Sequence, residues 1–290
     1  MYDLLLAPFA EFGFLRRALV GCLALALSAP PLGVFLVLRR TSLTADALAH
    51  GVLPGIALGF LLAGGASVVA MSLGGLAAGL LVVVGAGALA RATGGREDAT
   101  LAALYLVSLA LGVALVSTSA GSAELTRLLF GSVLGVDDAA LLLIAGVASV
   151  TLPALALAWR PLVLEGFDPG FARAEGARGG AWHALFLALV ALNVLAAAQA
   201  LGTLMAVGLM MLPALAARHL SPTVGGVAAL SVAVAAASAL VGLLASYHLD
   251  LPSGPAVVLA AGAAWALCVV AGPVDGLLAG RARRRRHLAG

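Results

Sequence analysis

The sequence contains no lysine and very little charge. All 16 of its basic residues are arginine, and charged residues make up only 10% of the chain. A P-loop requires the motif G-x-x-x-x-G-K-[ST], whose lysine holds the phosphates of the nucleotide. We therefore expect no ATPase site in this chain, and any ATP-driven activity would need a separate ATPase subunit.

Cysteine is also scarce. Cys22 and Cys268 are the two cysteines of the chain, and both lie in apolar stretches without a C-x-x-C partner. We expect them to be buried as small apolar residues. The sequence also lacks H-E-x-x-H, the helical histidine pair with a catalytic glutamate that zinc proteases use, which argues against an intramembrane metalloenzyme.

Apolar sequence, in contrast, is abundant. Hydrophobic residues make up 63% of the 290 residues, and the mean hydropathy is +1.14. An ordinary soluble domain carries about 25% charged residues, and a membrane-spanning helix needs about 20 apolar ones. The chain is therefore predicted to be an all-α polytopic membrane protein, a single transmembrane domain over 1–290 with about nine (eight to ten) spans. These are expected near 16–38, 46–65, 67–90, 99–118, 139–159, 182–200, 203–217, 223–246 and 254–274.

The arginines gather at one set of span ends. Arg39, Arg40, Arg91, Arg96, Arg160, Arg173, Arg178, Arg218 and the tail 281–290 fall on one side, whereas Glu124, Arg127, Asp137, Asp138 and Asp250 fall on the other. The positive-inside rule makes the first side cytoplasmic, with the N-terminus outside and the C-terminus inside. Arg16 and Arg17 are exceptions to this pattern, because they are expected on the outer side. The basic tail is explained as an anchor on anionic lipid, so we expect no nucleic-acid partner.

Asp46 and His50 are the strongest candidates for a functional site. A spacing of four residues places both side chains on one face of a helix, and zinc, manganese and iron accept carboxylate and imidazole ligands. Ionisable groups are costly within a membrane and usually functional. In the alternative interpretation, Asp46 and His50 have unrelated roles. Thr44 caps the helix, Asp46 interacts with the helix dipole, and His50 lies at the interface between membrane and water. The residues alone leave both interpretations open.

Two ligands do not complete a metal's coordination shell. The remaining ligands would come from water, another helix or a second copy of the chain, and an incomplete shell suits transport because the ion must leave. His248 and Asp250 are weaker candidates at the outer mouth, where a solvated turn is the simpler interpretation, although they could receive an incoming cation. Asn193 and Gln199 are expected to form hydrogen bonds between helices.

The stretch 160–180 is predicted to be cytoplasmic and to contain one short helix. Asp168 is a good N-cap, Pro169 suits the first helical position, and Gly176 suits the left-handed stop. The helix would carry Phe167 and Phe171. It could dock into a groove on a soluble partner, or it could lie on the membrane surface.

Six motifs in order resemble one family, the membrane permeases of bacterial ATP-driven zinc, manganese and iron importers (ZnuB/MntB-like permeases). They are R-R-x-S-L-x-x-D-A-L-A-H-x-x-L-P-G at 39–55, R-E-D at 96–98, L-F-G-x-x-L-G-V at 129–136, F-D-P-x-F-A-R-A-x-G at 167–176, Q-A-L-G-T-L-M at 199–205 followed by P-A at 213–214, and S-Y-x-L-D-L-P-S-G at 246–254. The resemblance runs from about residue 15 to residue 272. Glu175 and His248 depart from the usual pattern, and neither touches the Asp46/His50 motif.

The resemblance implies a type II ABC importer fold in a bacterial plasma membrane, with a homodimer of permeases forming the path. Asp46 and His50 match the metal-coordinating positions of the family. The segment that contacts the ATPase is matched by Phe167, Asp168, Pro169, Phe171, Ala172, Arg173 and Gly176.

The resemblance also implies the partners and the mechanism. A separate subunit hydrolyses ATP, an extracytoplasmic binding protein delivers the divalent ion, and the chain itself needs no cofactor. Transport proceeds by alternating access, without covalent chemistry in this chain. The choice among zinc, manganese and iron stays open. The alternatives are a siderophore- or cobalamin-type ABC permease, whose bulky ligands have no need of an Asp/His pair, and an ion-coupled secondary transporter.

Overall fold

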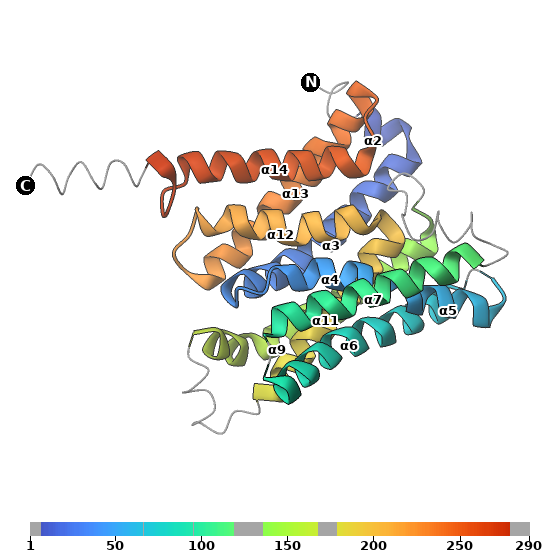
Figure 1. Ribbon diagram of the computed structural model, residues 1–290. Helices are drawn as coiled ribbons and strands as arrows, with labels where there is room; N and C mark the ends of the chain where they lie inside the picture. The colour runs from blue at the N-terminus through green and yellow to red at the C-terminus, as the bar shows by residue number, and fades with distance from the viewer. Residues whose placement is uncertain (1–6, 66, 95, 119–135, 168–178, 279–290) are drawn as a thin grey trace, which may run out of the picture.

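A computed structural model describes residues 7–65, 67–94, 96–118, 136–167 and 179–278 of the chain. The regular elements of these residues are all helices (Figure 1). In chain order they are α2 (Ala7–Glu11), α3 (Gly13–Leu38), α4 (Leu43–Gly51), α5 (Leu53–Ala63), α6 (Val68–Thr93), α7 (Glu97–Thr118), α9 (Asp138–Phe167), α11 (Gly179–Leu201), α12 (Thr203–Arg218), α13 (Val224–Leu249) and α14 (Ser253–Ala271).

The helices confirm the predicted membrane architecture. Within the described ranges, eight helical stretches are long and apolar enough to cross a membrane, with α4 and α5 counted together as Leu43–Ala63. The remaining predicted span, 203–217, is α12, whose 16 residues extend about 24 Å at 1.5 Å per residue. Each predicted span therefore corresponds to a helix, and the protein is a multi-pass membrane protein.

The helices differ in how much of their surface other helices bury. Most of α3, α11 and α12 is buried, whereas α7 and α14 expose most of their apolar side chains. Exposed leucine and valine are expected where a helix faces lipid, because lipid tails are as apolar as leucine. The outer helices thus form the lipid-facing shell around a central group.

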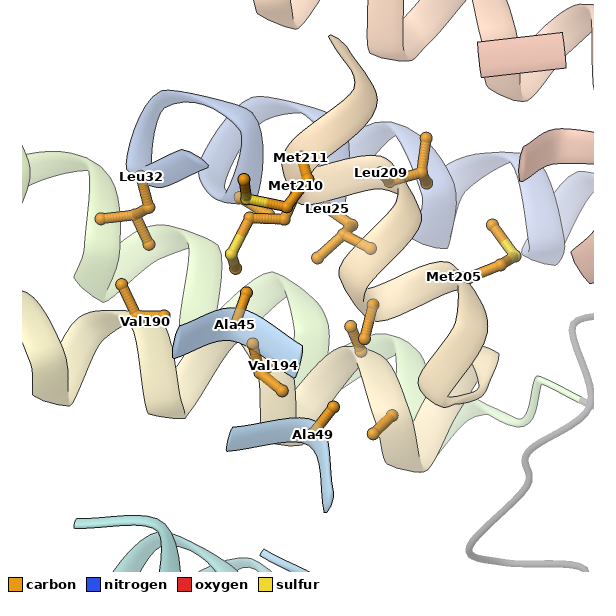
Figure 2. Close-up of a cluster of buried hydrophobic side chains, with 14 of the residues drawn as sticks. Leu25, Leu32, Ala45, Ala49, Val190, Val194, Met205, Leu209, Met210 and Met211 are labelled. Atoms are coloured by element: carbon orange, nitrogen blue, oxygen red, sulfur yellow. The ribbon is translucent and has the colours of Figure 1, made fainter. Parts of the chain in front are cut away.

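The core holds α4 in a fixed rotation. Figure 2 shows Ala45 and Ala49 of α4 among buried side chains from the neighbouring helices: Leu25 and Leu32 of α3, Val190 and Val194 of α11, and Met205, Leu209, Met210 and Met211 of α12. Ala45 and Ala49 are almost fully buried. Since side chains four residues apart share a face, the two alanines turn the next positions, Asp46 and His50, away from this core.

Glycines allow α5 and α6 to touch along their backbones. A Cβ atom on Gly55 would collide with the carbonyl of Gly74, and one on Gly59 would collide with the carbonyl of Ala70. Small residues at helix crossings let backbones approach in this way, which is how membrane helices gain packing energy. This contact anchors α5, and with it the C-terminal end of α4.

One ion pair involves Arg17, one of the two arginines that lie apart from the others. Arg17 Nη2 lies 3.3 Å from Asp138 Oδ1, so the start of α3 and the start of α9 meet at one end of the bundle. The sequence had placed Arg17 and Asp138 on the same side, and the pair confirms this relative placement. Both side chains are well exposed, at 51% and 78%.

Candidate functional site

Asp46 lies in the first turn of α4. The helix is preceded by Ser42, which makes no side-chain capping bond, and it begins at Leu43. Thr44 is buried inside the helix, so the interpretation of Thr44 as the N-cap was wrong by two residues. A negative charge in the first turn, here Asp46, interacts favourably with the helix dipole.

The Asp46 and His50 side chains do lie on one face. Nε2 of His50 is 3.8 Å from Oδ1 of Asp46. Two metal–ligand bonds of about 2.1 Å at a tetrahedral angle place their donor atoms about 3.4 Å apart, so this pair is within about 0.4 Å of the separation that one ion would impose. His50 is 36% exposed and Asp46 51% exposed, so the pair faces outward from the bundle.

Helix α7 borders this pair. The Tyr105 ring lies 6.5 Å from the His50 ring, centroid to centroid, with 27° between their planes. The Ser108 hydroxyl on the same helix donates a 2.9 Å hydrogen bond to the carbonyl of Gly51. Pro54 and Gly55, at the start of α5, are buried, so the break between α4 and α5 is packed by protein.

Among the described residues, Asp46 and His50 are not joined by a third potential metal ligand. The residues of known placement contain no group of three or more histidine, cysteine, aspartate or glutamate side chains that could hold an ion. Asp46 and His50 together would supply two ligands, and the origin of the remaining ligands stays a prediction from the sequence.

The remaining predicted site residues lie in other places. His248 and Asp250 are exposed at the end of α13, where Asp250 adopts a left-handed conformation with φ of 51° and Ser246 donates a 2.7 Å hydrogen bond to the Leu251 carbonyl. Phe167 is the last residue of α9 and is 68% exposed. Asp168, Pro169, Phe171, Ala172, Arg173 and Gly176 lie outside the described residues.

The interhelical hydrogen bonds expected of Asn193 and Gln199 are present. Nδ2 of Asn193 donates to Oγ1 of Thr151 at 2.7 Å, joining α11 to α9. The Ser72 hydroxyl donates to Oε1 of Gln199 at 3.3 Å, joining α6 to α11. Both polar groups therefore serve packing between helices.

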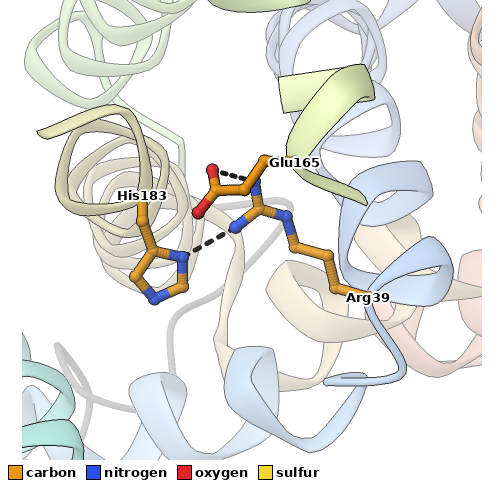
Figure 3. Close-up of polar contacts among 3 residues, drawn as sticks. All are labelled: Arg39, Glu165 and His183. Atoms are coloured by element: carbon orange, nitrogen blue, oxygen red, sulfur yellow. Dashed lines mark hydrogen bonds and ion pairs between the residues drawn. The ribbon is translucent and has the colours of Figure 1, made fainter. Parts of the chain in front are cut away.

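Sequence reasoning missed a polar cluster at the end of α3. Arg39, which the sequence marks as a topology charge and as part of the motif at 39–55, lies between Glu165 of α9 and His183 of α11 (Figure 3). Its guanidinium donates to Glu165 Oε2 at 2.9 Å and lies 2.7 Å from His183 Nδ1. No local spacing signals this cluster, because Arg39 precedes Glu165 by 126 residues and His183 by 144 residues in the sequence.

Comparison with known proteins places this arrangement in a family. A model of the ABC 3 transport family matches residues 11–271. The chain belongs to the ABC 3 transport family. It is 31% identical over 249 residues to the manganese import system permease protein ScaB of Streptococcus parasanguinis, a match that covers 86% of this chain and 87% of ScaB.

Two other matches agree with this assignment. A probable iron transport system membrane protein of Haemophilus influenzae is 29% identical over 259 residues, covering 89% of this chain and 93% of that protein. The solved structure of PsaBC from Streptococcus pneumoniae in complex with Fab superposes with a TM-score of 0.84 at 27% identity, covering 95% of this chain and 98% of the matched one. The chain is thus an ABC permease subunit, which confirms both the predicted fold and the family resemblance.

Proposed function

We propose that this ABC 3 family permease imports a divalent transition metal ion, manganese, iron or zinc, and that Asp46 and His50 bind the ion in transit. The observation that carries the proposal is the outward-facing Asp46/His50 pair in a membrane-spanning stretch. A carboxylate facing hydrocarbon would cost several kcal/mol, of the order of 3 or more, so this face needs a polar or protein covering.

A second copy of the chain supplies such a covering. Two copies that met at α4 would bring together two carboxylates and two imidazoles, which is the number of donors in a tetrahedral shell. The ion path would then run between the copies, as expected for a homodimeric permease with alternating access. A siderophore or cobalamin would gain nothing from this pair.

The relatives support the substrate class and the partners. Proteins named for manganese and iron transport are similar to this chain over most of its length. We infer that a separate ATPase subunit contacts the segment 168–178 and its flanks, including Phe167. An extracytoplasmic binding protein would deliver the ion at the opposite end, near His248 and Asp250. By the positive-inside rule, the arginine-rich end lies in the bacterial cytoplasm.

The test is a measurement of cellular manganese, iron and zinc by elemental mass spectrometry under metal limitation. A deletion strain is complemented with wild type, Asp46→Asn, His50→Gln or, as a control, Asp138→Asn, at equal membrane expression. We expect one metal to fall on deletion and to recover with wild type and Asp138→Asn alone. Full recovery with Asp46→Asn and His50→Gln would remove the pair from the path. If deletion changes none of the three metals, the proposed substrate class is wrong.

A further inference from the structure

Arg39 is a buried cation with three separate partners. Its side chain is 10% exposed, and it bonds Glu165, which is 21% exposed, and His183. The guanidinium carbon also lies 4.9 Å from the centre of the Phe186 ring. A planar guanidinium can bond a carboxylate and an imidazole while its face lies over an aromatic ring, and an ammonium group cannot do all three. A lysine therefore does not replace an arginine here.

Burial separates Arg39 from the other arginines. Its neighbour Arg40, together with Arg91, Arg160 and Arg218, is exposed at the same end of the bundle. An arginine that anchors topology interacts with lipid headgroups and must reach them. Arg39 instead places its charge inside the protein, and its desolvation is offset only while Glu165 remains in place.

The partners of Arg39 bracket the segment 168–178. Glu165 lies two residues before the end of α9 at Phe167, and His183 lies in the second turn of α11. Figure 3 shows the Arg39 side chain reaching between these two helices. The Arg39 side chain therefore joins the end of α9 to the start of α11, the two helices that flank the segment 168–178.

Arg39 is also joined closely to the helix that carries the metal ligands. It directly follows α3 as its C-cap residue, and α4 begins four residues later at Leu43. This link is tight, because the backbone N–H groups of Thr41 and Thr44 donate to the carbonyls of Leu36 and Thr41, each at 3.0 Å. Asp46 follows in the first turn of α4.

We propose that Arg39 is a positioning residue for transport. Its contacts with Glu165 and His183 carry a displacement of the two ends of the segment 168–178 to α4, and so to Asp46 and His50. The inference rests on the proposed function, in which an ATPase acts on that segment. Arg39 touches no metal in this role, and its loss would separate ATP hydrolysis from ion movement.

The experiment measures metal imported per ATP hydrolysed. The full transporter, permease with its ATPase and binding protein, is reconstituted in proteoliposomes with manganese, ferrous iron and zinc supplied separately. Variants are Arg39→Gln, Arg39→Lys, Glu165→Gln and the double variant Arg39→Gln/Glu165→Gln. Arg91→Gln removes an exposed arginine from the same end and is the matched control. Gel filtration and thermal unfolding establish that each complex is assembled.

We expect the ratio to fall at least about fivefold in both Gln single variants, the lower end of typical coupling between sites. The double variant should fall no further than the single ones, because the two side chains act as one unit. Arg39→Lys should stay low although it keeps the charge, and Arg91→Gln should match wild type.

Other outcomes overturn the inference. An assembled Arg39→Lys or Arg39→Gln complex with the wild-type ratio contradicts it, as does an equal loss in Arg91→Gln. Transport and ATP hydrolysis that fall in proportion indicate a purely structural role for Arg39. If the wild-type complex hydrolyses ATP but imports none of the three metals, the proposed function fails first, and the inference fails with it.

Discussion

The Ser108 hydroxyl on α7 is bonded to the carbonyl of Gly51, the last residue of α4, at 2.9 Å. Carbonyls at the C-terminal end of a helix lack partners within that helix, and inside a membrane no bulk water replaces them. Ser108 therefore donates a hydrogen bond to the carbonyl of Gly51, the residue that follows His50. This bond holds the junction between α4 and α5 against α7, and it fixes where His50 lies.

The first prediction concerns this bond. Ser108→Ala leaves a buried carbonyl without its donor and should lower the free energy of unfolding by about 1–3 kcal/mol. Thermal unfolding in detergent measures the change. Ser117→Ala is the control, because Ser117 is exposed on the same helix and bonds only the Ala114 carbonyl of its own helix. Equal stability of the two variants would show that the Ser108 bond contributes nothing.

The second prediction concerns the contact between α5 and α6. Gly55→Ala places a methyl group against the Gly74 backbone and forces the helices apart, at a cost of about 1–3 kcal/mol for overpacking. Gly146→Ala in α9 meets open space and should be neutral or stabilising by up to about 1 kcal/mol. Unfolding temperatures of the two purified variants are compared. A stable Gly55→Ala protein would mean that the close approach is not needed for packing.

The third prediction concerns the hydrogen bond between α9 and α11. Thr151→Val keeps the shape of the side chain but removes the oxygen that accepts from Asn193. The loss should be about 0.6 kcal/mol and no more than about 1.7, the range measured for such bonds between membrane helices. Ser149→Ala, which removes an exposed hydroxyl bonded within α9, is the control. Unfolding in mixed micelles gives both values, and a larger loss for Ser149→Ala would contradict the argument.

The fourth prediction concerns the exposed pair of Arg17 and Asp138. Since both side chains are more than half exposed, Asp138→Asn should change the free energy of unfolding by less than about 1 kcal/mol. Raising the salt concentration should reduce even that difference. Chemical unfolding at low and high ionic strength provides the comparison. A large loss that persists in high salt would show that the pair is buried in the assembled transporter.

The sequence predicts the spans well because each depends on local hydropathy. The span expected at 16–38 is the helix Gly13–Leu38, and the pair of Asp46 and His50 shares a face because spacing alone determines that. The span expected at 139–159 lies within the helix Asp138–Phe167, which continues eight residues beyond it. Hydropathy reports the limit of the apolar stretch, and a helix can extend past that limit.

Tertiary contacts explain what the sequence does not predict. Arg39 meets Glu165 and His183 only after α3, α9 and α11 have packed, and the positive-inside rule counts Arg39 as a loop charge without assigning it a partner. The start of α4 was also misplaced. Thr44 is buried at the place where its sequence suggests a cap, because packing rather than capping preference determines where this short helix begins.

The short length of α12 affects how the protein responds to the thickness of the bilayer. At about 24 Å, the helix is shorter than a hydrocarbon core of about 30 Å. It packs on α3, α11, α13 and α14, so its ends are matched to protein neighbours and not to lipid. Hydrophobic mismatch is relieved by tilting or by local thinning where a helix touches lipid. Changes in membrane thickness therefore act on the outer helices such as α7, while the neighbours of α12 alone set its length.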